Sequence, residues 1–405
     1  MTDRIRVLFA IGSLGCGGSE RQVLNILTRL DRSRFEPHLY LLDRSGEFLA
    51  DVPDDVSVKA FSDDVQAGGI YVPGKIFRQQ VAHLTEHLRS SRFDVLYDRT
   101  FLMPPVTGPA TKATGVPRVS TITADPERDL ANNLHRFVWL KKKLLAKSYR
   151  EAACVVGVSN GVRRSAETFY GLDAAKTRTI YNGFDFELIR SRAAEACPVE
   201  MPGEEDSFCI ACVGRLQREK GVDVLLRALR IAVHDRGLSN LRLIVVGDGP
   251  DADSLRSLCR DLNLDQCVTF AGFQSNPYAV LSKCRLLCLP SRYEGMPNAL
   301  VEALACGLPT IASNCPHGPR EILEGEQLGE LVTPDDPAAL AAAIERAVEK
   351  PSSETDQTAR FESVAGRFSI ERSVAEVEET LVEIAALRER TSGRVIECRK
   401  SQSSR

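Results

Sequence analysis

The chain has 405 residues, of which 43% are hydrophobic and 26% charged, and its formal net charge at pH 7 is −3. This length exceeds what one hydrophobic core usually supports, so two domains are expected, and the composition is that of an ordinary globular protein. The small negative net charge gives no overall attraction to nucleic acid, which is therefore not an expected partner.

No stretch of the sequence has the roughly 18 consecutive apolar residues that cross a bilayer. The apolar run Val7–Ile11 near the N-terminus is too short for a signal peptide, so a cytoplasmic protein is expected. Cys209 and Cys212 have CxxC spacing within an expected strand. Because residues three apart on a strand face opposite ways, core packing is expected there instead of metal or redox chemistry.

Short β-branched runs alternate with amphipathic stretches of helix length, which indicates a parallel α/β architecture. In the first half of the chain, the expected strands are Ile5–Ile11, His38–Leu42, Asp94–Tyr97, Arg118–Ile122 and Cys154–Val158. In the second half they are Phe208–Val213, Leu241–Val246, Cys267–Ala271, Leu286–Leu289 and Thr310–Ala312. The pattern predicts two doubly wound, Rossmann-like domains that face a cleft and bind ligands at the carboxyl ends of their strands.

The polar segment Glu187–Asp206, with two prolines and an acidic cluster, separates the two strand-rich regions and is the expected linker. The C-terminal helix is expected to pack back on the first domain. The tail is polar, basic and short of apolar residues, so disorder is expected there. The expected divisions are a first domain at 1–190, a linker at 191–206, a second domain at 207–369, a C-terminal helix at 370–390 and a tail at 391–405.

A glycine-rich run, Ile11–Glu20, follows the first strand and precedes an expected helix at Arg21–Leu30. Glycines at such a junction let backbone N–H groups approach an anion, and the helix start adds a favourable partial charge. The run matches neither the Walker A pattern nor the full dinucleotide fingerprint, because Glu20 stands where the last glycine belongs. From the residues alone, a phosphate contact at Gly17 and Gly18 and a flexible turn remain equally open.

A second candidate segment, Gly214–Gly221, follows the strand Phe208–Val213. Arg215 and Lys220 could converge on one anionic group there. An arginine offers a planar fork and a lysine a point charge, a combination that suits a diphosphate. Alternatively, the same residues form a solvated basic turn.

The third candidate segment is Glu294–Ala303, at the end of another expected strand. Asn298 is a good N-cap residue, so a helix is expected over Asn298–Cys306. Glu302 lies about one turn into that helix, and Glu294 lies on the loop before it. Two carboxylates around a helix start can accept hydrogen bonds from sugar hydroxyls while the free N–H groups face a phosphate. A role of Glu302 in the helix dipole alone does not explain the whole run.

These three segments, in this order, resemble the retaining glycosyltransferases of family 4, which have the two-domain GT-B fold. The resemblance covers nearly the whole chain. It implies that Arg215 and Lys220 bind the donor diphosphate, that Glu302 binds the ribose and that Glu294 binds the transferred sugar. The donor-binding residues that it implies are Gly17, Gly18, Arg215, Lys220, Glu294, Gly295, Met296, Pro297, Asn298 and Glu302.

The segment Asn314–Ile322 is similar to the branch of the family that builds lipopolysaccharide cores and lipid-linked oligosaccharides. The resemblance implies a UDP-sugar that donates a hexosyl or N-acetylhexosaminyl group, and a saccharide or lipid-linked saccharide acceptor. Many relatives have a His after the strand Arg118–Ile122, where this chain has Thr121–Pro126. Asp125 could take part of that role, beside Glu294, as a catalytic residue. No cofactor is expected.

Three other chemistries are less consistent with the sequence. Asp251 and Asp253 resemble the acidic pair of metal-using transferases, but at the start of the expected helix Ser254–Leu262 they would cap it, so no metal is expected. Gly247–Ala252 fits GxGxxA, yet Cys267–Gln274 lacks the acid that an NAD-dependent oxidoreductase would need there. A non-catalytic scaffold would not need both glutamates and both cations. Another GT-B enzyme, such as a UDP-sugar epimerase or a phosphorylase, is the closer alternative.

A basic stretch, Arg136–Arg150, contains six basic residues, no acidic residue and the single Trp of the chain. A basic amphipathic helix with aromatic residues can lie on an anionic bilayer surface, which would suit a lipid-linked acceptor at the inner face of the cytoplasmic membrane. Alternatively, the helix covers a sheet, with Phe137, Leu140 and Leu144 inward at helical spacing. Both interpretations remain open at this point.

Overall fold

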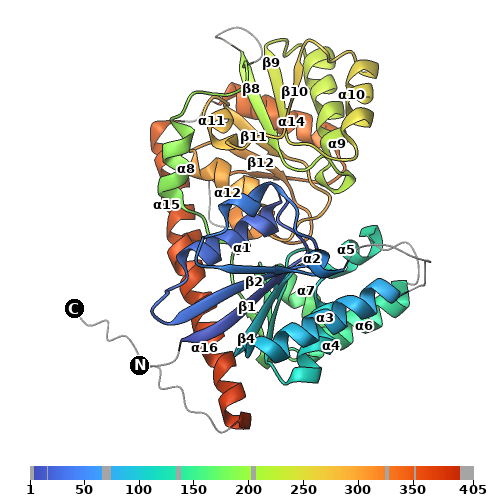
Figure 1. The fold of residues 1–405 in the computed structure, drawn as a ribbon. Coiled ribbons are helices and arrows are strands. Elements are labelled where there is room, and N and C mark those ends of the chain that lie inside the picture. Colours follow the sequence, from blue (N-terminus) through green and yellow to red (C-terminus); the bar gives the residue numbers. More distant parts are fainter. Residues whose placement is uncertain are drawn as a thin grey trace. The chain divides into compact units, whose positions relative to one another are not determined.

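The chain folds into two compact units in the computed structural model (Figure 1). One unit contains Met1–Gly183 and Glu371–Arg405, and the other contains Phe184–Ile370. The first unit was expected to end at residue 190. In the structure its first segment ends at Gly183, seven residues earlier. The structure describes residues 4–15, 17–65, 74–133, 138–201, 207–323, 328–350 and 353–392.

The first unit is built on a parallel seven-stranded sheet with the order β3-β2-β1-β4-β5-β6-β7. Its strands are β1 (Ile5–Ile11), β2 (Phe35–Leu41), β3 (Ser57–Ala60), β4 (Val95–Arg99), β5 (Arg118–Ile122), β6 (Cys154–Gly157) and β7 (Thr177–Thr179). Its helices are α1 (Gly18–Arg29), η1 (Glu47–Asp51), α2 (Phe61–Asp64), α3 (Lys75–Ser91), α4 (Pro104–Thr114), α5 (Pro126–Asn133), α6 (Val138–Glu151), α7 (Asn160–Tyr170), η2 (Ala174–Lys176) and most of α16 (Ile370–Ser392).

Burial separates the strands that the sequence predicted from those it missed. Every residue of β4, β5 and β6 is buried, as is nearly all of β1, because helices cover both faces of a parallel sheet. Such strands have continuous apolar runs, and the expected bounds of Ile5–Ile11 and Arg118–Ile122 are confirmed. The edge strands β3 and β7 are short and largely half-exposed, so no apolar run marks them.

The second unit has a parallel six-stranded sheet with the order β10-β9-β8-β11-β12-β13. Its strands are β8 (Phe208–Val213), β9 (Leu241–Val246), β10 (Val268–Gly272), β11 (Leu286–Leu289), β12 (Thr310–Ser313) and β13 (Glu330–Val332). Its helices are α8 (Phe186–Ala193), η3 (Arg218–Lys220), α9 (Val222–Arg230), η4 (Ile231–Asp235), α10 (Ala252–Asp261), α11 (Pro277–Leu281), α12 (Asn298–Ala305), α13 (Pro319–Leu323), α14 (Pro337–Glu349) and α15 (Glu354–Phe368). All five strands expected in this half are present, and the three-residue edge strand β13 was missed.

Part of the segment expected to be a linker is helical. The carboxylate of Asp185 accepts a hydrogen bond from the N–H of Leu188 at 2.9 Å and so caps α8. Phe186 and Ile189 are buried, and the amide of Asn276 donates to the carbonyl of Arg192 at 2.9 Å. The polar composition of this segment concealed a short amphipathic helix that packs on α11 of the second unit.

The C-terminal helix α16 lies against the first unit (Figure 1). The carboxylate of Glu378 accepts hydrogen bonds from the N–H of Asp31 at 2.8 Å and from the guanidinium of Arg34 at 2.9 Å. The hydroxyl of Ser373 donates to the carbonyl of Tyr181 at 2.7 Å. These contacts join residues far apart in sequence and hold α16 on this unit. The expected disordered tail falls almost wholly on residues 393–405, outside the described part of the chain.

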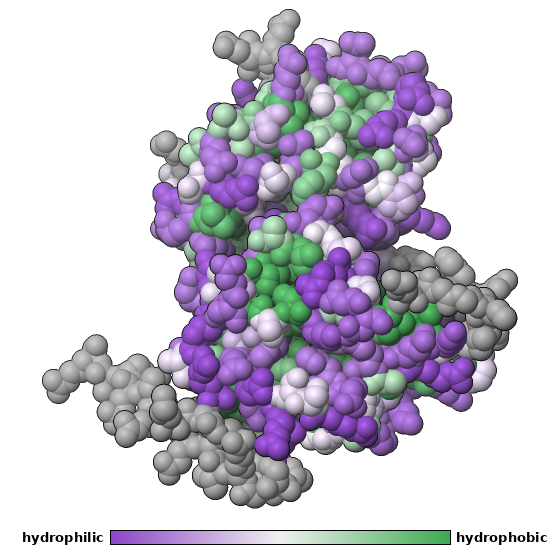
Figure 2. Space-filling view, in the orientation of Figure 1, coloured by the Kyte–Doolittle hydropathy of each residue, from purple (hydrophilic) through white to green (hydrophobic). Residues whose placement is uncertain are grey.

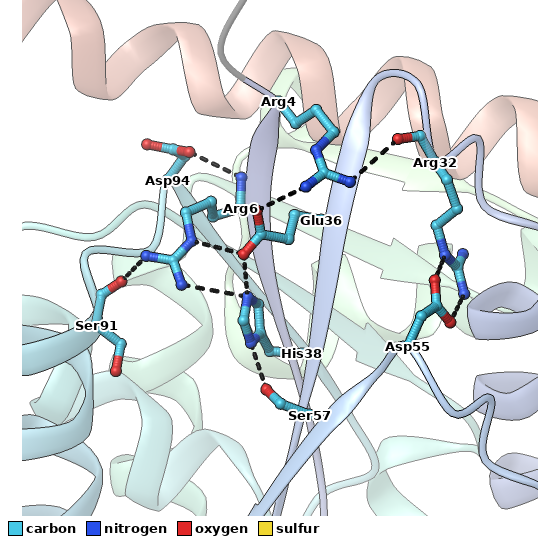
Figure 3. Close-up of polar contacts among 9 residues, drawn as sticks. All are labelled: Arg4, Arg6, Arg32, Glu36, His38, Asp55, Ser57, Ser91 and Asp94. Atoms are coloured by element: carbon cyan, nitrogen blue, oxygen red, sulfur yellow. Dashed lines mark hydrogen bonds and ion pairs between the residues drawn. The ribbon is translucent and has the colours of Figure 1, made fainter.

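A polar network ties the strands of the first sheet together near their amino ends (Figure 3). The guanidinium of Arg6 on β1 donates to the Glu36 carboxylate on β2 at 3.2 Å, and the N–H of Arg6 donates to Asp94, just before β4, at 2.8 Å. The His38 ring lies 3.0 Å from the same Glu36 oxygen. Burial and the charge of Arg6 together lower the pKa of His38, although the Glu36 carboxylate opposes them. Since ligands of such folds bind at the opposite edge, this network stabilises the sheet.

The described cysteines are all free thiols, and within the described residues no helix is long and apolar enough to cross a bilayer. Cys209 and Cys212 are both buried in β8, as expected for core residues. The Cys209 sulfur lies 3.7 Å from that of Cys284. The CxxC spacing therefore reflects packing within the core of the second unit.

Candidate functional site

Two loops of the second unit meet at the carboxyl ends of β8 and β11, which are neighbouring parallel strands. The loop after β8 carries Arg215 and the short helix η3, which ends at Lys220. The loop after β11 runs from Pro290 to Pro297, just before α12. Because neighbouring parallel strands end at the same edge of a sheet, residues 74 positions apart come together here.

A partly buried ion pair joins the two loops. The ammonium of Lys220 donates to Oε1 of Glu294 at 2.7 Å, and the hydroxyl of Ser291 donates to the same oxygen at 2.7 Å. The side chain of Glu294 is only 7% exposed and that of Lys220 is 27% exposed. Burial alone would lower the pKa of Lys220, but the nearby acidic groups, Glu294 foremost and then Glu219, together outweigh it, and the pKa lies above its ordinary value. Lys220 therefore stays charged at neutral pH.

The pair leaves several polar groups available to a ligand. Oε2 of Glu294 has no hydrogen-bond partner among the described residues. A lysine ammonium has three N–H donors, and Glu294 uses one of them. The side chain of Arg215 is exposed and forms no ion pair within the described part of the chain. The edge of the sheet thus offers two cations and one carboxylate oxygen, a set that suits an anionic ligand with hydroxyl groups.

Gly221 allows the two loops to approach so closely. Its φ is +65°, and a Cβ at this position would lie 2.1 Å from the carbonyl oxygen of Pro290. Gly221 also accepts, through its carbonyl, the N–H of Val224 at 2.9 Å at the start of α9. A side chain here would push the loop of Lys220 away from that of Glu294.

The GxGxxA segment Gly247–Ala252 packs against the loop after β8. A Cβ on Gly247 would lie 1.9 Å from the carbonyl oxygen of Gly214, and one on Gly249 would lie 2.4 Å from that of Leu216. The N–H of Leu216 donates to the carbonyl of Asp248 at 2.9 Å. Close packing of two loops therefore accounts for these glycines, without a dinucleotide.

The acidic pair beside this segment is placed as the start of a helix. Asp251 occupies the N-cap position of α10, although its side chain makes no capping hydrogen bond, and Asp253 lies in the first turn. The carboxylate of Asp253 pairs with Arg256 at 3.0 Å on the surface. Across the described residues, no group of three or more His, Cys, Asp or Glu side chains is arranged to hold a metal ion.

The helix α12 begins at Asn298, directly after the loop of Glu294. The expected cap at Asn298 is wrong by one position, because Pro297 occupies the N-cap and Asn298 is the first helical residue. Glu302 is the fifth residue of the helix and is half-buried. The hydroxyl of Tyr278, on α11, lies 3.5 Å from Oε1 of Glu302.

The loop of Glu294 is supported from the side by Gly318. Gly295, Met296 and Pro297 are buried. Gly318 has a φ of +83°, and a Cβ there would lie 2.5 Å from Cδ of Pro297 and 3.1 Å from the carbonyl oxygen of Gly295. The segment Asn314–Ile322, whose pattern stood out in the sequence, therefore packs directly on the candidate site.

In the first unit, Gly17 is the N-cap of α1 and Gly18 is its first residue. A Cβ on Gly17 would lie 2.3 Å from a carboxylate oxygen of Glu20, so the missing side chain leaves room for Glu20 to fold back over the helix start. This is the geometry of an acidic residue in the first turn that favours the helix dipole. Gly17 and Gly18 thus form the start of α1 in the segment after β1, and the helix begins three residues before the expected start at Arg21.

Asp125 caps α5 at the carboxyl end of β5. One carboxylate oxygen accepts the N–H groups of Glu127 at 3.1 Å and Arg128 at 2.9 Å. The other accepts a hydrogen bond from the hydroxyl of Ser165 at 3.3 Å. The side chain is 6% exposed, and its carboxylate acts as the N-cap of α5.

The helix α6 does not pack in the way expected for a helix with Leu140 and Leu144 inward. These two side chains are 43% and 48% exposed, and Trp139 is 62% exposed. The buried side of α6 is formed instead by Leu145, Ala146, Ser148 and Tyr149, and the helix contacts α4 and α7. Phe137 lies outside the described residues. The inward placement of Leu140 and Leu144 is therefore wrong, and these two side chains face solvent together with Trp139.

The sequence interpretation missed the groups that hold the charged pair in place. Ser291 directly precedes the Glu294 segment, but an isolated serine carries no signal of its own. Tyr278 lies on a five-residue helix, too short for periodicity to show. Arg292 forms a network with two aspartates, of which Asp335 is 43 residues away, so only folding brings them together.

Two family models match the chain. Residues 16–188 match the model of glycosyltransferase family 4, and residues 200–362 match the model of glycosyl transferases group 1. The structure of Anabaena HepE in complex with UDP-glucose is similar in fold, with a TM-score of 0.75 at 22% identity over 94% of this chain and 100% of that chain. The two parallel α/β units thus constitute the GT-B fold.

Curated relatives agree with these matches. The N-acetylgalactosamine-N,N'-diacetylbacillosaminyl-diphospho-undecaprenol 4-alpha-N-acetylgalactosaminyltransferase of Campylobacter jejuni is 26% identical over 84% of this chain and 89% of that relative. The lipopolysaccharide core biosynthesis glycosyltransferase LpsD of Rhizobium meliloti is 34% identical, but over 44% of this chain and 52% of that relative. Since the two models match successive parts of the chain, residues 16–188 and 200–362, the chain belongs to the glycosyltransferases of family 4.

We predict that Gly221→Ala destabilises the second unit more than Gly237→Ala does. Both glycines have left-handed backbone conformations, with φ of +65° and +73°, so both substitutions cost about 1 kcal/mol of backbone strain. Only at Gly221 does the new Cβ also meet a carbonyl oxygen, whereas nothing lies within 4 Å of a Cβ at Gly237. Urea denaturation of the two variants measures the difference. Equal losses would show that the loops do not need this close approach.

Proposed function

We propose that the chain is a retaining hexosyltransferase that moves a hexosyl or N-acetylhexosaminyl group from a UDP-sugar to a saccharide or lipid-linked saccharide acceptor. The observation that carries this proposal is the Lys220–Glu294 pair, 2.7 Å apart at the carboxyl edge of the second sheet, with the exposed Arg215 on the same loop as Lys220. Cations with a buried carboxylate fit a ligand that combines a diphosphate with sugar hydroxyls.

Each residue has a distinct role in the proposal. Lys220 and Arg215 bind the diphosphate, and Glu302 accepts hydrogen bonds from the ribose hydroxyls. Oε2 of Glu294 accepts a hydrogen bond from a hydroxyl of the transferred sugar, since Oε1 is already occupied by Lys220 and Ser291. The remaining proposed donor contacts are the backbone of Gly17 and Gly18 in the first unit, and Gly295, Met296, Pro297 and Asn298 in the second.

The proposed reaction needs charge stabilisation more than acid–base chemistry at the leaving group. As the bond between the sugar and the diphosphate breaks, negative charge grows on the β-phosphate. Cations held near that oxygen stabilise the transition state more than the ground state. Lys220 is held in its charged form by Glu294, so it meets this charge without reorganisation. Retention of the anomeric configuration follows from attack of the acceptor hydroxyl on the face that the phosphate leaves, and that phosphate takes its proton.

The relatives support the choice of donor and acceptor. The solved structure of Anabaena HepE contains UDP-glucose, and the Campylobacter jejuni relative acts on an undecaprenol-linked saccharide according to its name. LpsD acts in the synthesis of the lipopolysaccharide core. A UDP-sugar and a lipid-linked or lipopolysaccharide acceptor are therefore the proposed substrates, with cytoplasmic action at the inner face of the membrane.

We predict that one UDP-sugar raises the melting temperature of the protein by several degrees. A ligand at 100 times its Kd stabilises the folded state by about 2.7 kcal/mol. Lys220→Met should lose most of this shift, because hydrogen bonds to charged groups contribute about 1.5–3 kcal/mol each. Lys283→Met removes an exposed lysine elsewhere in the same unit and should keep the full shift. A thermal-shift screen of nucleotide sugars measures all three proteins.

The proposal would be contradicted if neither a nucleoside diphosphate nor a nucleotide sugar stabilised the protein. Consumption of the donor without any acceptor, or release of a sugar phosphate by inorganic phosphate, would instead indicate an epimerase or a phosphorylase.

Beside Glu294, we propose Asp125 of the first unit as a second catalytic carboxylate. Asp125→Ala should lower the free energy of unfolding by about 0.5–2 kcal/mol, since it removes the cap of α5. Asp125→Asn keeps a capping oxygen and should fold with near wild-type stability while removing the charge. A lower kcat for Asp125→Asn is the result that the proposal expects. An unchanged kcat would leave Asp125 as a helix cap alone.

The surface around α6 supports the proposed membrane contact. Among the described residues, seven of the ten exposed large hydrophobic side chains lie in α6, at the start of α3 or in the turn before α4: Ile76, Phe77, Leu102, Val138, Trp139, Leu140 and Leu144. The helices α3 and α6 both contact α4, and Figure 2 shows hydrophobic surface at their amino ends. Four lysines of α6 accompany this surface, so we propose that it contacts anionic lipid.

We predict that charge reversal at Lys141, Lys142 and Lys143 abolishes sedimentation of the protein with vesicles containing anionic lipid. Each lysine near an anionic surface contributes about 1 kcal/mol, and reversal adds repulsion. Reversal of Arg260, Lys283 and Arg285 changes the net charge equally on exposed residues of the second unit and should leave sedimentation intact. Unchanged binding of the α6 variant, or equal loss in the control, would remove this part of the proposal.

A further inference from the structure

Arg292 lies in the loop between β11 and α12, beside the candidate site but with no role in the proposed chemistry so far. Its side chain is 19% exposed, and its guanidinium is surrounded by acceptors from three different segments. A guanidinium with this many protein acceptors is unusual for a residue in a surface loop, because most surface arginines are solvated.

The contacts of Arg292 converge on the segment that carries Lys220. The backbone N–H of Arg292 donates to the carbonyl of Glu219 at 2.7 Å, and its Nη1 donates to the carbonyl of Arg218 at 2.5 Å. Arg218 and Glu219 are the first two residues of η3, and Lys220 is the third. Arg292 therefore holds the backbone of η3 at the two positions directly before Lys220.

The same guanidinium holds the start of α9 and a third loop. Nη1 and Nη2 donate to the two carboxylate oxygens of Asp223 at 2.9 and 2.8 Å, a fork-to-fork pair. Nε donates to Asp335, which follows β13, at 2.6 Å. Burial alone would raise the pKa of Asp223, but the guanidinium of Arg292 outweighs it and the pKa lies below its ordinary value. Lys220 is thus flanked by Arg292 contacts on both sides in sequence.

On its own loop, Arg292 adjoins the groups that hold Glu294. Ser291, the preceding residue, donates its hydroxyl to Oε1 of Glu294 at 2.7 Å. One side chain thereby connects the backbone that presents Lys220 with the loop that presents Glu294. The distance between the ammonium and the carboxylate then depends on Arg292 as well as on their own attraction.

We propose that Arg292 is a positioning residue of the donor site, which sets Lys220 at the place where it meets the β-phosphate of the nucleotide. This inference rests on the proposed function. Arg292 does not touch the donor; it acts through η3. A lysine cannot replace it, because only a planar guanidinium reaches an aspartate fork, a backbone carbonyl and a second aspartate at once.

A residue that only stabilises the fold would make the same contacts. The test therefore needs a measured quantity that a change in stability alone does not alter, and the ratio of UDP to UMP affinity is such a quantity. UDP carries the β-phosphate and UMP lacks it. If Arg292 positions Lys220, its loss weakens UDP binding and leaves UMP binding nearly unchanged. If Arg292 only holds the fold together, both ligands lose affinity together or neither does.

The variants are Arg292→Met and Arg292→Lys, with Arg242→Met as the matched control. Arg242 likewise uses its guanidinium to bind backbone of the second unit, the carbonyls of Ser239 and Leu241, but at the amino end of β9. Calorimetric titration with UDP and with UMP gives the two dissociation constants for each protein, and urea denaturation confirms that each variant is folded.

The expected result is that Arg292→Met weakens UDP about tenfold while UMP changes by less than about twofold, and that Arg292→Lys falls between it and the wild type. Arg242→Met should change neither constant. Should Arg292→Met fail to fold, Arg292→Lys decides by the same ratio. An unchanged ratio of UDP to UMP affinity in folded variants would overturn the inference while the proposed function stands. A wild type that binds neither nucleotide would overturn the proposed function and the inference with it.

Discussion

The ion pair between Lys220 and Glu294 is the interaction on which the candidate site depends. A carboxylate that is 7% exposed is costly to bury unless it is paired and hydrogen-bonded, and both conditions are met at Oε1 of Glu294. The pair in turn requires two loops to approach within hydrogen-bond distance, which is possible because β8 and β11 are neighbours and because Gly221 has no side chain. The ion pair of the site therefore depends on the close packing of its two loops.

The amino ends of the strands in the first sheet and the carboxyl ends of the strands in the second sheet differ in how far their polar groups are satisfied. In the first unit, the amino ends of the strands are joined by a network of arginines, acids and a histidine whose members satisfy one another. At the carboxyl end of the second sheet, by contrast, Arg215 is exposed and one oxygen of Glu294 has no hydrogen-bond partner among the described residues. Satisfied groups stabilise a fold, whereas groups that still need partners are the ones that a ligand can use.

The sequence predicted the central strands, the order of the elements and the loops that carry Arg215, Lys220 and Glu294. Each of these features depends on a short run of neighbouring residues. It did not predict that Lys220 and Glu294 pair with each other, since they are 74 residues apart. It also left open whether Leu140 and Leu144 pack inward or face solvent, because helical spacing alone does not say which face of a helix packs on a neighbour. Edge strands such as β13 were missed because three residues, of which only Val332 is buried, leave no apolar run.

A crystal structure of the chain with a bound UDP-sugar tests the central claim most directly. The account predicts diphosphate oxygens within hydrogen-bond distance of the Lys220 ammonium and the Arg215 guanidinium, with a hydroxyl of the sugar on Oε2 of Glu294. A diphosphate bound elsewhere, or one that leaves Lys220 and Arg215 without contact, would contradict it.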